Sequence, residues 1–222
     1  MNILAIFAFA DSITNECMAL LAILNHKEPL TELKETSIMT TIDNEMEKIT
    51  IRKATSDDID AITGIYGQIH RQEREGKVTI GWDADTYPIK QTAEDALKDT
   101  SLYVMTLGTS IVASAIINQI QPDAYSLPDW KYRVSPDKVG VLHTLVVNPT
   151  HSHRGLGRQF VDFFERHCRE KGWEVARLDT QEKNTRALKF YPKIGYRLAG
   201  IYPTRFFTLP TEIRLAMFEK RL

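Results

Sequence analysis

Apolar residues recur at intervals of three and four in two long segments of the chain, which is the spacing of an amphipathic helix. Thr55 or Ser56 can cap the first helix, and Gly172 can end the second. Shorter helices are predicted from Thr92 through Leu97 and between a cap at Asn184 and an end at Gly195. The apolar positions are Ile59, Ile62, Ile65, Tyr66 and Ile69 in the first long segment, and Leu156, Phe160, Phe163, Phe164 and Cys168 in the second.

The other apolar residues alternate with polar ones or form short unbroken runs, and both patterns are typical of strands. The predicted strands cover residues 49–53, 102–107, 111–118, 139–147, 175–179, 196–201 and 214–220. A turn at residues 108–110 joins the second and third strands into a hairpin, and residues 121–137 form a long loop. The predicted order is strand, two helices, three strands, helix, strand, helix and two strands.

A basic, glycine-containing turn lies between the fourth predicted strand and the second long helix. Residues 141–158 read VLHTLVVNPTHSHRGLGR. Backbone N–H groups at a helix N-terminus lack intrahelical partners, and the helix dipole adds positive potential there. Gly155 lets the backbone approach an anion closely, while Arg154 and Arg158 add charge. The turn therefore predicts a diphosphate site, although an ordinary strand-to-helix turn also fits the pattern. The spacing matches neither a P-loop nor a dinucleotide fingerprint.

Two segments, taken together, carry a family resemblance. Residues 152–157 (SHRGLG) resemble the Arg/Gln-x-x-Gly-x-Gly/Ala segment of the GCN5-related N-acetyltransferases, the GNAT superfamily, which holds the diphosphate of acetyl-CoA. Ser152 departs from the usual Arg or Gln. Residues 184–196 (NTRALKFYPKIGY) resemble the second GNAT motif, Asn-x-x-Ala-x-x-x-Tyr-x-x-x-Gly-Phe/Tyr. The motifs stand in the right order, about thirty residues apart, and the resemblance covers roughly residues 47–222.

The resemblance implies an α/β fold with a mixed, mostly antiparallel sheet flanked by helices and splayed between the fourth and fifth strands. The pantetheine arm of acetyl-CoA would enter this gap like an additional strand. Core packing also explains these residues of the fourth strand, and both roles can hold at once, because the backbone would face the cofactor while the side chains face the core. Helix capping explains Asn184 equally well. The implied cofactor-binding residues are Leu145, Val146, Val147, Ser152, His153, Arg154, Gly155, Leu156, Gly157, Arg158 and Asn184.

The resemblance also implies direct acetyl transfer to an amine, which needs a neutral amine, an oxyanion donor and a proton for the departing thiolate. Tyr191 occupies the position where many family members place the general acid, although it could instead only steady the cofactor. His143 is the candidate general base, because a histidine titrates near neutrality; a structural histidine with water as the base is the alternative.

The expected acceptor is the primary amine of a small molecule. In the resembled family, Trp82, Tyr87, Trp130 and Tyr132 lie in segments that wall the acceptor site, but they could equally be packed lids. Alternatives are a non-catalytic acyl-CoA-binding module and acetylation of a macromolecule such as a protein N-terminus. Homodimers are common in the family, so a homodimer is possible.

The composition of the chain bears on its partners, disulfides and metal sites. The 222 residues include 43% hydrophobic ones and carry a formal net charge of −1, so we expect neither a nucleic-acid nor a membrane partner. Cys17 and Cys168 do not suggest a disulfide framework. His151 and His153 lack a convincing thiol or carboxylate partner, so no metal is expected. A cytoplasmic protein fits these features.

Residues 1–45 are predicted to be separate from an acetyltransferase domain at 46–222. The first 24 residues are apolar but interrupted by Asp11, Asn15 and Glu16, and they lack the run of about twenty residues needed to span a bilayer. We expect a helix over residues 11–24 and a polar linker over 25–44. Because Met46 looks like a natural start, a misassigned start codon and a genuine extension are both open, and a membrane anchor fits less well.

Overall fold

The computed structural model describes residues 48–205 and 212–222. Its contacts divide the chain into two units, one of Met1–Thr50 with Thr106–Ser110 and the other of Ile51–Met105 with Ile111–Leu222. The second unit carries every residue of the candidate site. The helix expected over residues 11–24 and the linker over 25–44 lie outside the described residues, and the boundary at residue 46 stays a prediction.

Seven strands form one mixed sheet in the order β1-β2-β3-β4-β5-β7-β6. β4 pairs with β5 in parallel, whereas β3–β4, β5–β7 and β6–β7 are antiparallel. This sheet confirms the predicted fold class. The strands are β1 (Ile49–Lys53), β2 (Leu102–Leu107), β3 (Ser110–Asn118), β4 (Val139–Val147), β5 (Val175–Gln181), β6 (Arg197–Thr204) and β7 (Ile213–Arg221).

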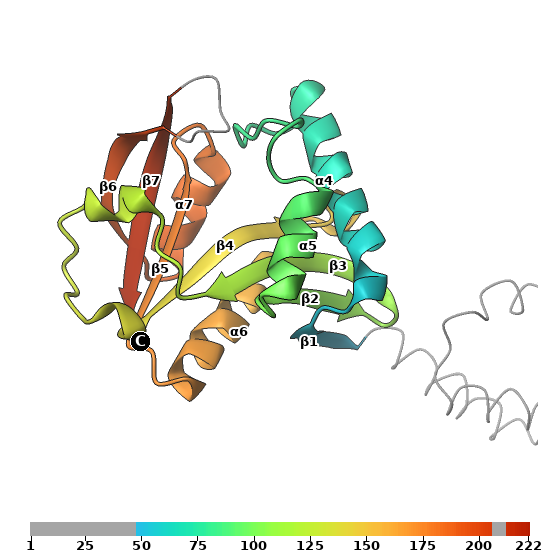
Figure 1. Cartoon of the computed structure of the whole chain (residues 1–222). Helices are drawn as coiled ribbons and strands as arrows, with labels where there is room; N and C mark the ends of the chain where they lie inside the picture. Colours follow the sequence, from blue (N-terminus) through green and yellow to red (C-terminus); the bar gives the residue numbers. More distant parts are fainter. Residues whose placement is uncertain (1–47, 206–211) are drawn as a thin grey trace, which may run out of the picture. The chain divides into compact units, whose positions relative to one another are not determined.

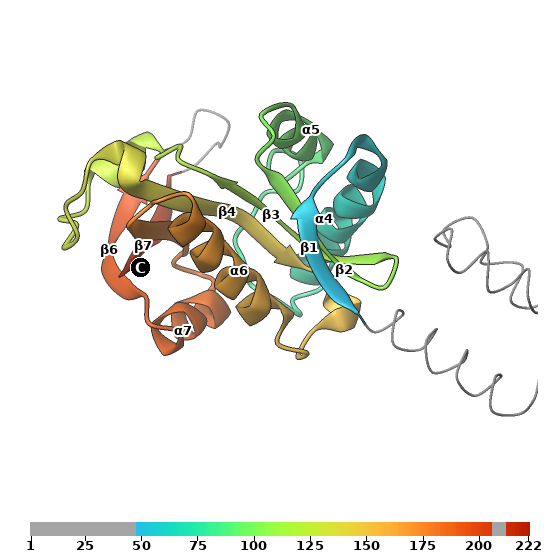
Figure 2. The ribbon, with the colours of Figure 1, turned by 90° about the horizontal axis from the view of Figure 1, so that it is seen from below.

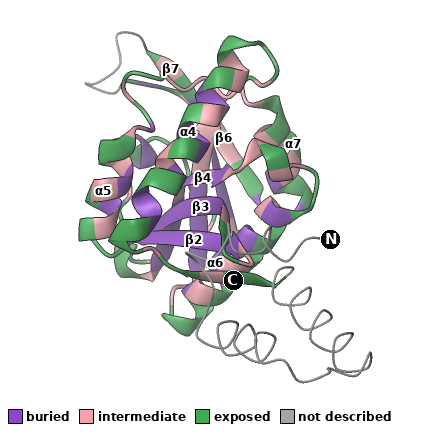
Figure 3. Cartoon of the chain, turned by 90° about the vertical axis from the view of Figure 1, so that its right-hand side faces the viewer, coloured by how far each residue is buried: buried purple, intermediate pink, exposed green. Residues whose placement is uncertain are grey.

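Among the described residues, four helices cover the two faces of this sheet. They are α4 (Ile59–Arg74), α5 (Lys90–Lys98), α6 (Leu156–Glu170) and α7 (Thr185–Lys193). α4 and α5 lie on one face, and α6 and α7 lie on the other (Figures 1 and 2). The apolar stripe of α4 packs on the central strands, which are buried (Figure 3). That stripe contains the predicted positions Ile59, Ile62, Ile65, Tyr66 and Ile69.

Two element boundaries differ from the sequence prediction. α5 begins at Lys90 rather than Thr92, because Thr92 lies in the first turn, where its hydroxyl accepts a hydrogen bond from the Ile89 backbone N–H at 3.1 Å. The periodicity locates the helix, but this reciprocal contact sets its first residue. β5 extends to Gln181, two residues beyond the prediction, because it pairs with β7 as far as Leu215.

The parallel pairing of β4 with β5 starts at Val139 and ends where Leu142 faces Leu178. Beyond this point β5 continues beside β7, while β4 continues beside β3. Ile116 faces His143 and Ser114 faces Val146, so β4 carries one residue more than β3 over this interval. Thr144, at that bulge, has φ of 50°. The strands therefore separate after Leu142, which confirms the predicted splay.

Candidate active site

The second half of β4 offers backbone groups at the splay. Within the described residues, no strand pairs with the edge of residues 143–147 that faces away from β3. Val146 is buried, and Leu145 and Val147 are half-buried, so their side chains contribute to packing. These three residues were predicted to bind the pantetheine arm. The free edge fits that role, and the contact itself stays a prediction.

The glycine turn lies between β4 and α6 and has an unusual backbone. His153 and Gly155 both have left-handed φ values, 66° and 73°, and α6 begins at Leu156. A Cβ placed on Gly155 would meet nothing within 4 Å, so open space adjoins the helix N-terminus. Arg158 pairs with Asp162 at 2.8 Å on the first turns of α6. The first-turn N–H groups and this open space fit a diphosphate.

The other predicted members of this site flank the turn. Ser152, after the short helix Pro149–His151, is half-buried, and its backbone N–H bonds to the Pro149 carbonyl at 3.3 Å. Arg154 is exposed, and a Cβ on Gly157 would lie 3.8 Å from the Val147 side chain. On the neighbouring α7, the Asn184 side chain accepts a hydrogen bond from the Ala187 N–H at 3.1 Å, so this asparagine caps the helix.

Tyr191 lies on α7 and is only 8% exposed. Its ring packs on Phe190, Tyr196 and Phe218, with ring centres 5.2 to 5.8 Å apart. Burial, and then the charge of Asp179, raise the pKa of the phenol above its ordinary value of 10.0. Tyr191 therefore keeps its proton at neutral pH and can act as a donor.

Asp179 is the residue that the sequence interpretation missed. It follows Leu178 on β5, immediately after the last residue paired with β4. Burial raises the pKa of its carboxyl to about 6, and a hydrogen bond donated by the Tyr125 hydroxyl at 2.9 Å opposes that rise. A carboxylate with a pKa near neutrality beside a protonated tyrosine is a combination typical of acid–base sites.

His143 lies in a buried environment that changes its ability to accept a proton. Burial lowers the pKa of its ring to about 4, so the imidazole is neutral at physiological pH. Its Nε2 lies 3.1 Å from Oδ1 of Asn118, and that same oxygen accepts the Ile120 N–H at 2.9 Å. Because Oδ1 can only accept, Nε2 carries the proton and donates it to the amide. This contact ties β4 to the end of β3.

Arg177, Asp179 and Gln181 alternate along β5, and each contacts a loop. Arg177 donates to Oε1 of Gln121 at 2.6 Å, and Gln181 donates to the backbone carbonyl of Gly81. Together with Asp179, which bonds to Tyr125, these side chains join β5 to the loop after β3 and to the segment between α4 and α5. The sequence held a signal for this arrangement: central strands are usually apolar on both faces.

Glu219 on β7 fixes the same loop from a neighbouring strand. Its side chain is 0% exposed and accepts hydrogen bonds from the backbone N–H groups of Lys131 and Tyr132, at 2.9 and 3.2 Å. Arg197 pairs with it at 2.7 Å. These three contacts with a buried carboxylate restrain the loop. The same loop contains Tyr125, whose hydroxyl bonds to Asp179.

The four aromatic residues predicted for the acceptor site fall into two groups. Trp82 and Tyr87 pack edge to face, with ring centres 5.9 Å apart, and the Tyr87 hydroxyl bonds to the Thr144 hydroxyl at the β4 bulge. Tyr87 is 36% exposed, but its hydroxyl end is buried and its pKa rises to about 12. These two residues lie beside the splay.

Trp130 and Tyr132 instead support the long loop. Trp130 is 8% exposed, its ring lies 4.1 Å from the Arg177 guanidinium, and its Nε1 donates to the Tyr125 carbonyl at 2.7 Å. The Tyr132 carbonyl accepts from Arg177 at 3.3 Å. Their contacts are with the protein itself, so direct contact with an acceptor stays a prediction without further support.

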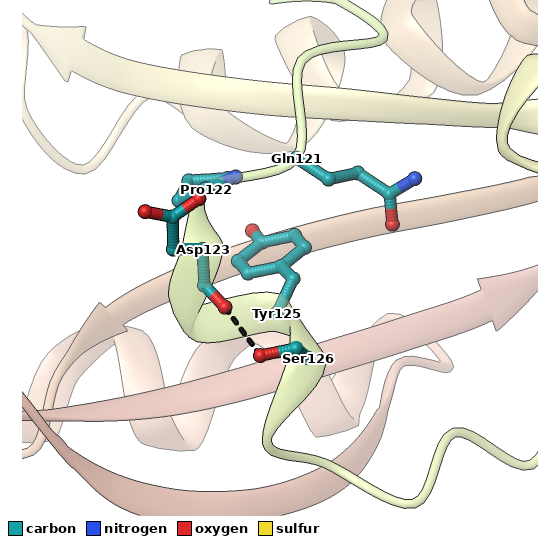
Figure 4. A pocket seen from close by; sticks show the side chains of 5 residues that line it. All are labelled: Gln121, Pro122, Asp123, Tyr125 and Ser126. Carbon is teal, nitrogen blue, oxygen red and sulfur yellow. Dashed lines mark hydrogen bonds between the residues drawn. The ribbon is translucent and has the colours of Figure 1, made fainter.

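An open pocket of about 460 Å³ lies at the short helix of the same loop, Asp123–Ser126 (Figure 4). The Ser126 hydroxyl donates to the Asp123 carbonyl at 2.7 Å on its wall. The remaining lining residues are Gln121, Pro122 and Tyr125, none of which was predicted to contact acetyl-CoA. We therefore do not assign the cofactor to this pocket.

Residues 68–196 match the model of the acetyltransferase (GNAT) family. The match spans more than half of the chain, which therefore belongs to this family of acetyltransferases. Membership confirms the predicted class and, with it, acetyl-CoA as the co-substrate. A search of curated proteins finds no match.

Solved structures share the fold. A GCN5-related N-acetyltransferase from Kribbella flavida is 18% identical with a TM-score of 0.58, covering 78% of this chain and 98% of that chain. A ribosomal-protein-alanine N-acetyltransferase from Brucella melitensis is 16% identical, with a TM-score of 0.58 and coverages of 78% and 99%. The protein yncA from Salmonella typhimurium, solved with its cofactor acetyl-CoA, is 17% identical with a TM-score of 0.56 and coverages of 78% and 93%.

Within residues 48–205 and 212–222, no helix is long and apolar enough to cross a bilayer. The same residues contain no group of three or more His, Cys, Asp or Glu side chains placed to hold a metal ion.

Proposed function

We propose that this acetyltransferase transfers the acetyl group of acetyl-CoA directly to the primary amine of a small molecule. The observation that carries the proposal is that Asp179, at the splay, lies near enough to Tyr191 on α7 for its charge to raise the pKa of that phenol. One side chain is suited to take a proton near neutral pH, and the other to give one. Both are needed for direct transfer from a thioester to an ammonium group.

In this mechanism Asp179 accepts a proton from the acceptor ammonium, which leaves a neutral amine. The amine nitrogen bonds to the thioester carbonyl carbon, and the carbon–sulfur bond then breaks. Tyr191 gives its proton to the departing thiolate, and the nitrogen of the new amide gives its second proton to the tyrosinate, so the products are an amide and CoA with a free thiol. Asp179 then releases its proton to solvent. Holding both substrates in the splay supplies much of the rate by positioning.

We assign the base to Asp179 rather than His143. The pKa of about 4 makes His143 a weak base, and its Nε2 is engaged with Asn118. Asp179, with a pKa of about 6, is closer to the operating pH at which a general base is most effective. His143 then has the structural role that was the alternative for it.

The test uses the full-length protein with Tyr191→Phe. Calorimetric titration measures acetyl-CoA affinity, and thiol release over a panel of small primary amines and one short peptide measures turnover. The variant should lose about 100-fold in kcat with unchanged acetyl-CoA affinity, because only the hydroxyl is removed. Tyr103→Phe is the matched control, since its hydroxyl faces His167 at 3.5 Å instead.

The outcomes separate the candidate functions. Turnover with small amines supports the proposal, and turnover with the peptide alone favours a protein N-terminus as acceptor. Acetyl-CoA binding without any turnover by the wild-type protein favours a non-catalytic acyl-CoA-binding module. A Tyr191→Phe variant with full kcat would remove the acid role of Tyr191.

A further inference from the structure

The segment between α4 and α5 is anchored to both strands that diverge at the splay. We call residues 80–87 the strap; it extends from the end of α4 toward β5 (Figure 1). At one end, the Gln181 side chain on β5 donates to the Gly81 carbonyl. At the other end, the Tyr87 hydroxyl bonds to Thr144 on β4. The strap therefore bridges the two strands just beyond the last residues that pair between them.

The contact at Gly81 is closely fitted. Oε1 of Glu73, on α4, accepts the backbone N–H groups of Ile80 and Gly81 at 2.9 and 2.5 Å, so the turn is held from the helix side as well. Gly81 has φ of 87°, and a Cβ there would lie 2.1 Å from Oε1 of Gln181. The fit needs glycine at one position and a side-chain amide donor at the other. Gln181 itself is only 8% exposed.

The strap is also close to the proposed base. Gln181 and Asp179 are two residues apart on β5, so their side chains point to the same face about 6.6 Å apart along the strand. The negative charge of Asp179 contributes to the raised pKa of Tyr87, at the far end of the strap. Tyr125 approaches Asp179 from the loop after β3. The strap and that loop therefore both contact β5 within two residues of Asp179.

We propose that Gln181 is a positioning residue: through Gly81 it fixes the strap beside Asp179 and restricts the acceptors to compact primary amines. The inference rests on the proposed function and adds a determinant of specificity to it. With the strap tied to both strands, the approach to Asp179 has a fixed width. Without the Gln181 contact, the strap stays attached to α4 and β4 but no longer to β5, so bulkier amines gain access.

The first experiment compares Gln181→Ala and Gly81→Ala with the wild-type protein on a panel of primary amines of increasing size. Both variants should raise KM for compact amines about tenfold, because a misplaced wall costs positioning. Acetyl-CoA affinity should be unchanged, and activity on bulky amines should increase. In a double-mutant cycle, the two changes should not be additive, because each breaks the same contact. Gln91→Ala is the matched control, since Gln91 is exposed and bonds within its own helix to Asp95.

The second experiment needs no turnover. Limited digestion with a protease that cuts before aspartate should cleave at Asp83 and Asp85 faster in Gln181→Ala than in the wild-type protein or Gln91→Ala. Unchanged cleavage, or an unchanged amine profile in an active variant, overturns the role of Gln181 and leaves the proposed function standing. Absence of wild-type turnover on every amine instead overturns the proposed function, and the digestion result alone then decides whether Gln181 holds the strap.

Discussion

The Tyr125 hydroxyl donates a hydrogen bond to Asp179, and removing this hydroxyl should change the pKa of the carboxyl group. Burial raises the pKa of Asp179 to about 6, and the hydrogen bond from Tyr125 opposes the rise, so Tyr125→Phe should raise that pKa further. A base must be deprotonated, and kcat/KM therefore falls as the pH drops through its pKa. The acidic limb of the pH profile should move to higher pH in the variant. Profiles of kcat/KM from about pH 5 to about pH 8 check this, with Tyr103→Phe as the control.

A limb that stays in place, or moves to lower pH, would contradict the assignment of the base to Asp179. The magnitude of kcat/KM at high pH serves as an internal reference, because Asp179 is ionised there in both proteins. A uniform loss across the whole range would indicate only a displaced loop.

Asp179 should also make the folded protein less stable at neutral pH. Its folded pKa of about 6 exceeds the ordinary value of 3.8, so the folded state binds the proton more tightly than the unfolded state. Stability therefore falls as the pH rises from about 4 to about 6, and the loss is complete above that window. Asp179→Asn should have a higher urea midpoint than the wild-type protein at neutral pH, with the difference vanishing near pH ~4.

The matched control for this measurement is Asp99→Asn, an exposed aspartate at the end of α5. Because Asp99 is exposed, its replacement should change the urea midpoint at neutral pH much less than Asp179→Asn does. If Asp179→Asn is less stable than the wild-type protein at neutral pH, the carboxylate is stabilising and the raised pKa is wrong. Stabilisation together with lost activity is the usual relation for a side chain that serves a reaction.

The sequence could name Tyr191 but not Asp179, and the reason is physical. Tyr191 stands at a fixed place in a motif, whereas the pKa of Asp179 depends on burial at the point where two strands separate. Trp130 shows the same limit of sequence-based prediction. Its place in a loop suggests the acceptor site, but the sequence does not reveal its contact with Arg177, which lies on a strand far along the chain. Non-local contacts of this kind leave no local pattern.

At the scale of elements, the role of the glycine turn before α6 in binding acetyl-CoA can be tested separately from its contribution to stability. Gly155 and Gly76 have similar left-handed φ values, 73° and 69°, and a Cβ on either would meet nothing within 4 Å. Alanine at each position should therefore cost a similar amount of stability, about 1 kcal/mol. Only Gly155 lies at the predicted diphosphate site, so only Gly155→Ala should weaken acetyl-CoA binding.

The measurement is a pair of calorimetric titrations with acetyl-CoA, each matched by a urea unfolding curve. An affinity at the wild-type value in both variants would place the diphosphate elsewhere. Equal losses of affinity would show that the effect arises from general destabilisation rather than from contact with the ligand.

The elements themselves were predictable because their patterns are local. The stripe from Ile59 to Ile69 and the strand at residues 139–147 follow directly from apolar spacing. The bulge at Thr144 was not predictable, since it arises from the register between β3 and β4. The strap was not predictable either, because Gly81 and Gln181 are a hundred residues apart in the chain. Local rules place the elements, and long-range contacts shape the site.

At the scale of the whole molecule, β5 connects the parts of the site. Its first half holds β4 in the sheet, and its second half carries Asp179 and Gln181 after β4 has diverged. The loop after β3 and the strap each form a hydrogen bond with this second half. A ligand between β4 and β5 would therefore contact the region where these two strands no longer pair, beside the residues proposed for acid–base chemistry and acceptor selection.

This arrangement predicts where acetyl-CoA should protect backbone amides from hydrogen exchange. Residues 139–142 of β4 already pair with β5, whereas no strand that the structure describes pairs with residues 143–147 on that side. Acetyl-CoA should therefore slow exchange in residues 143–147 and leave residues 139–142 unchanged, because the pantetheine arm supplies the missing partner. Adenosine 3′,5′-bisphosphate, which lacks the pantetheine arm, is the control and should protect neither half of β4. Equal protection of both halves by acetyl-CoA would indicate global stabilisation, and no protection would place the pantetheine arm outside the splay.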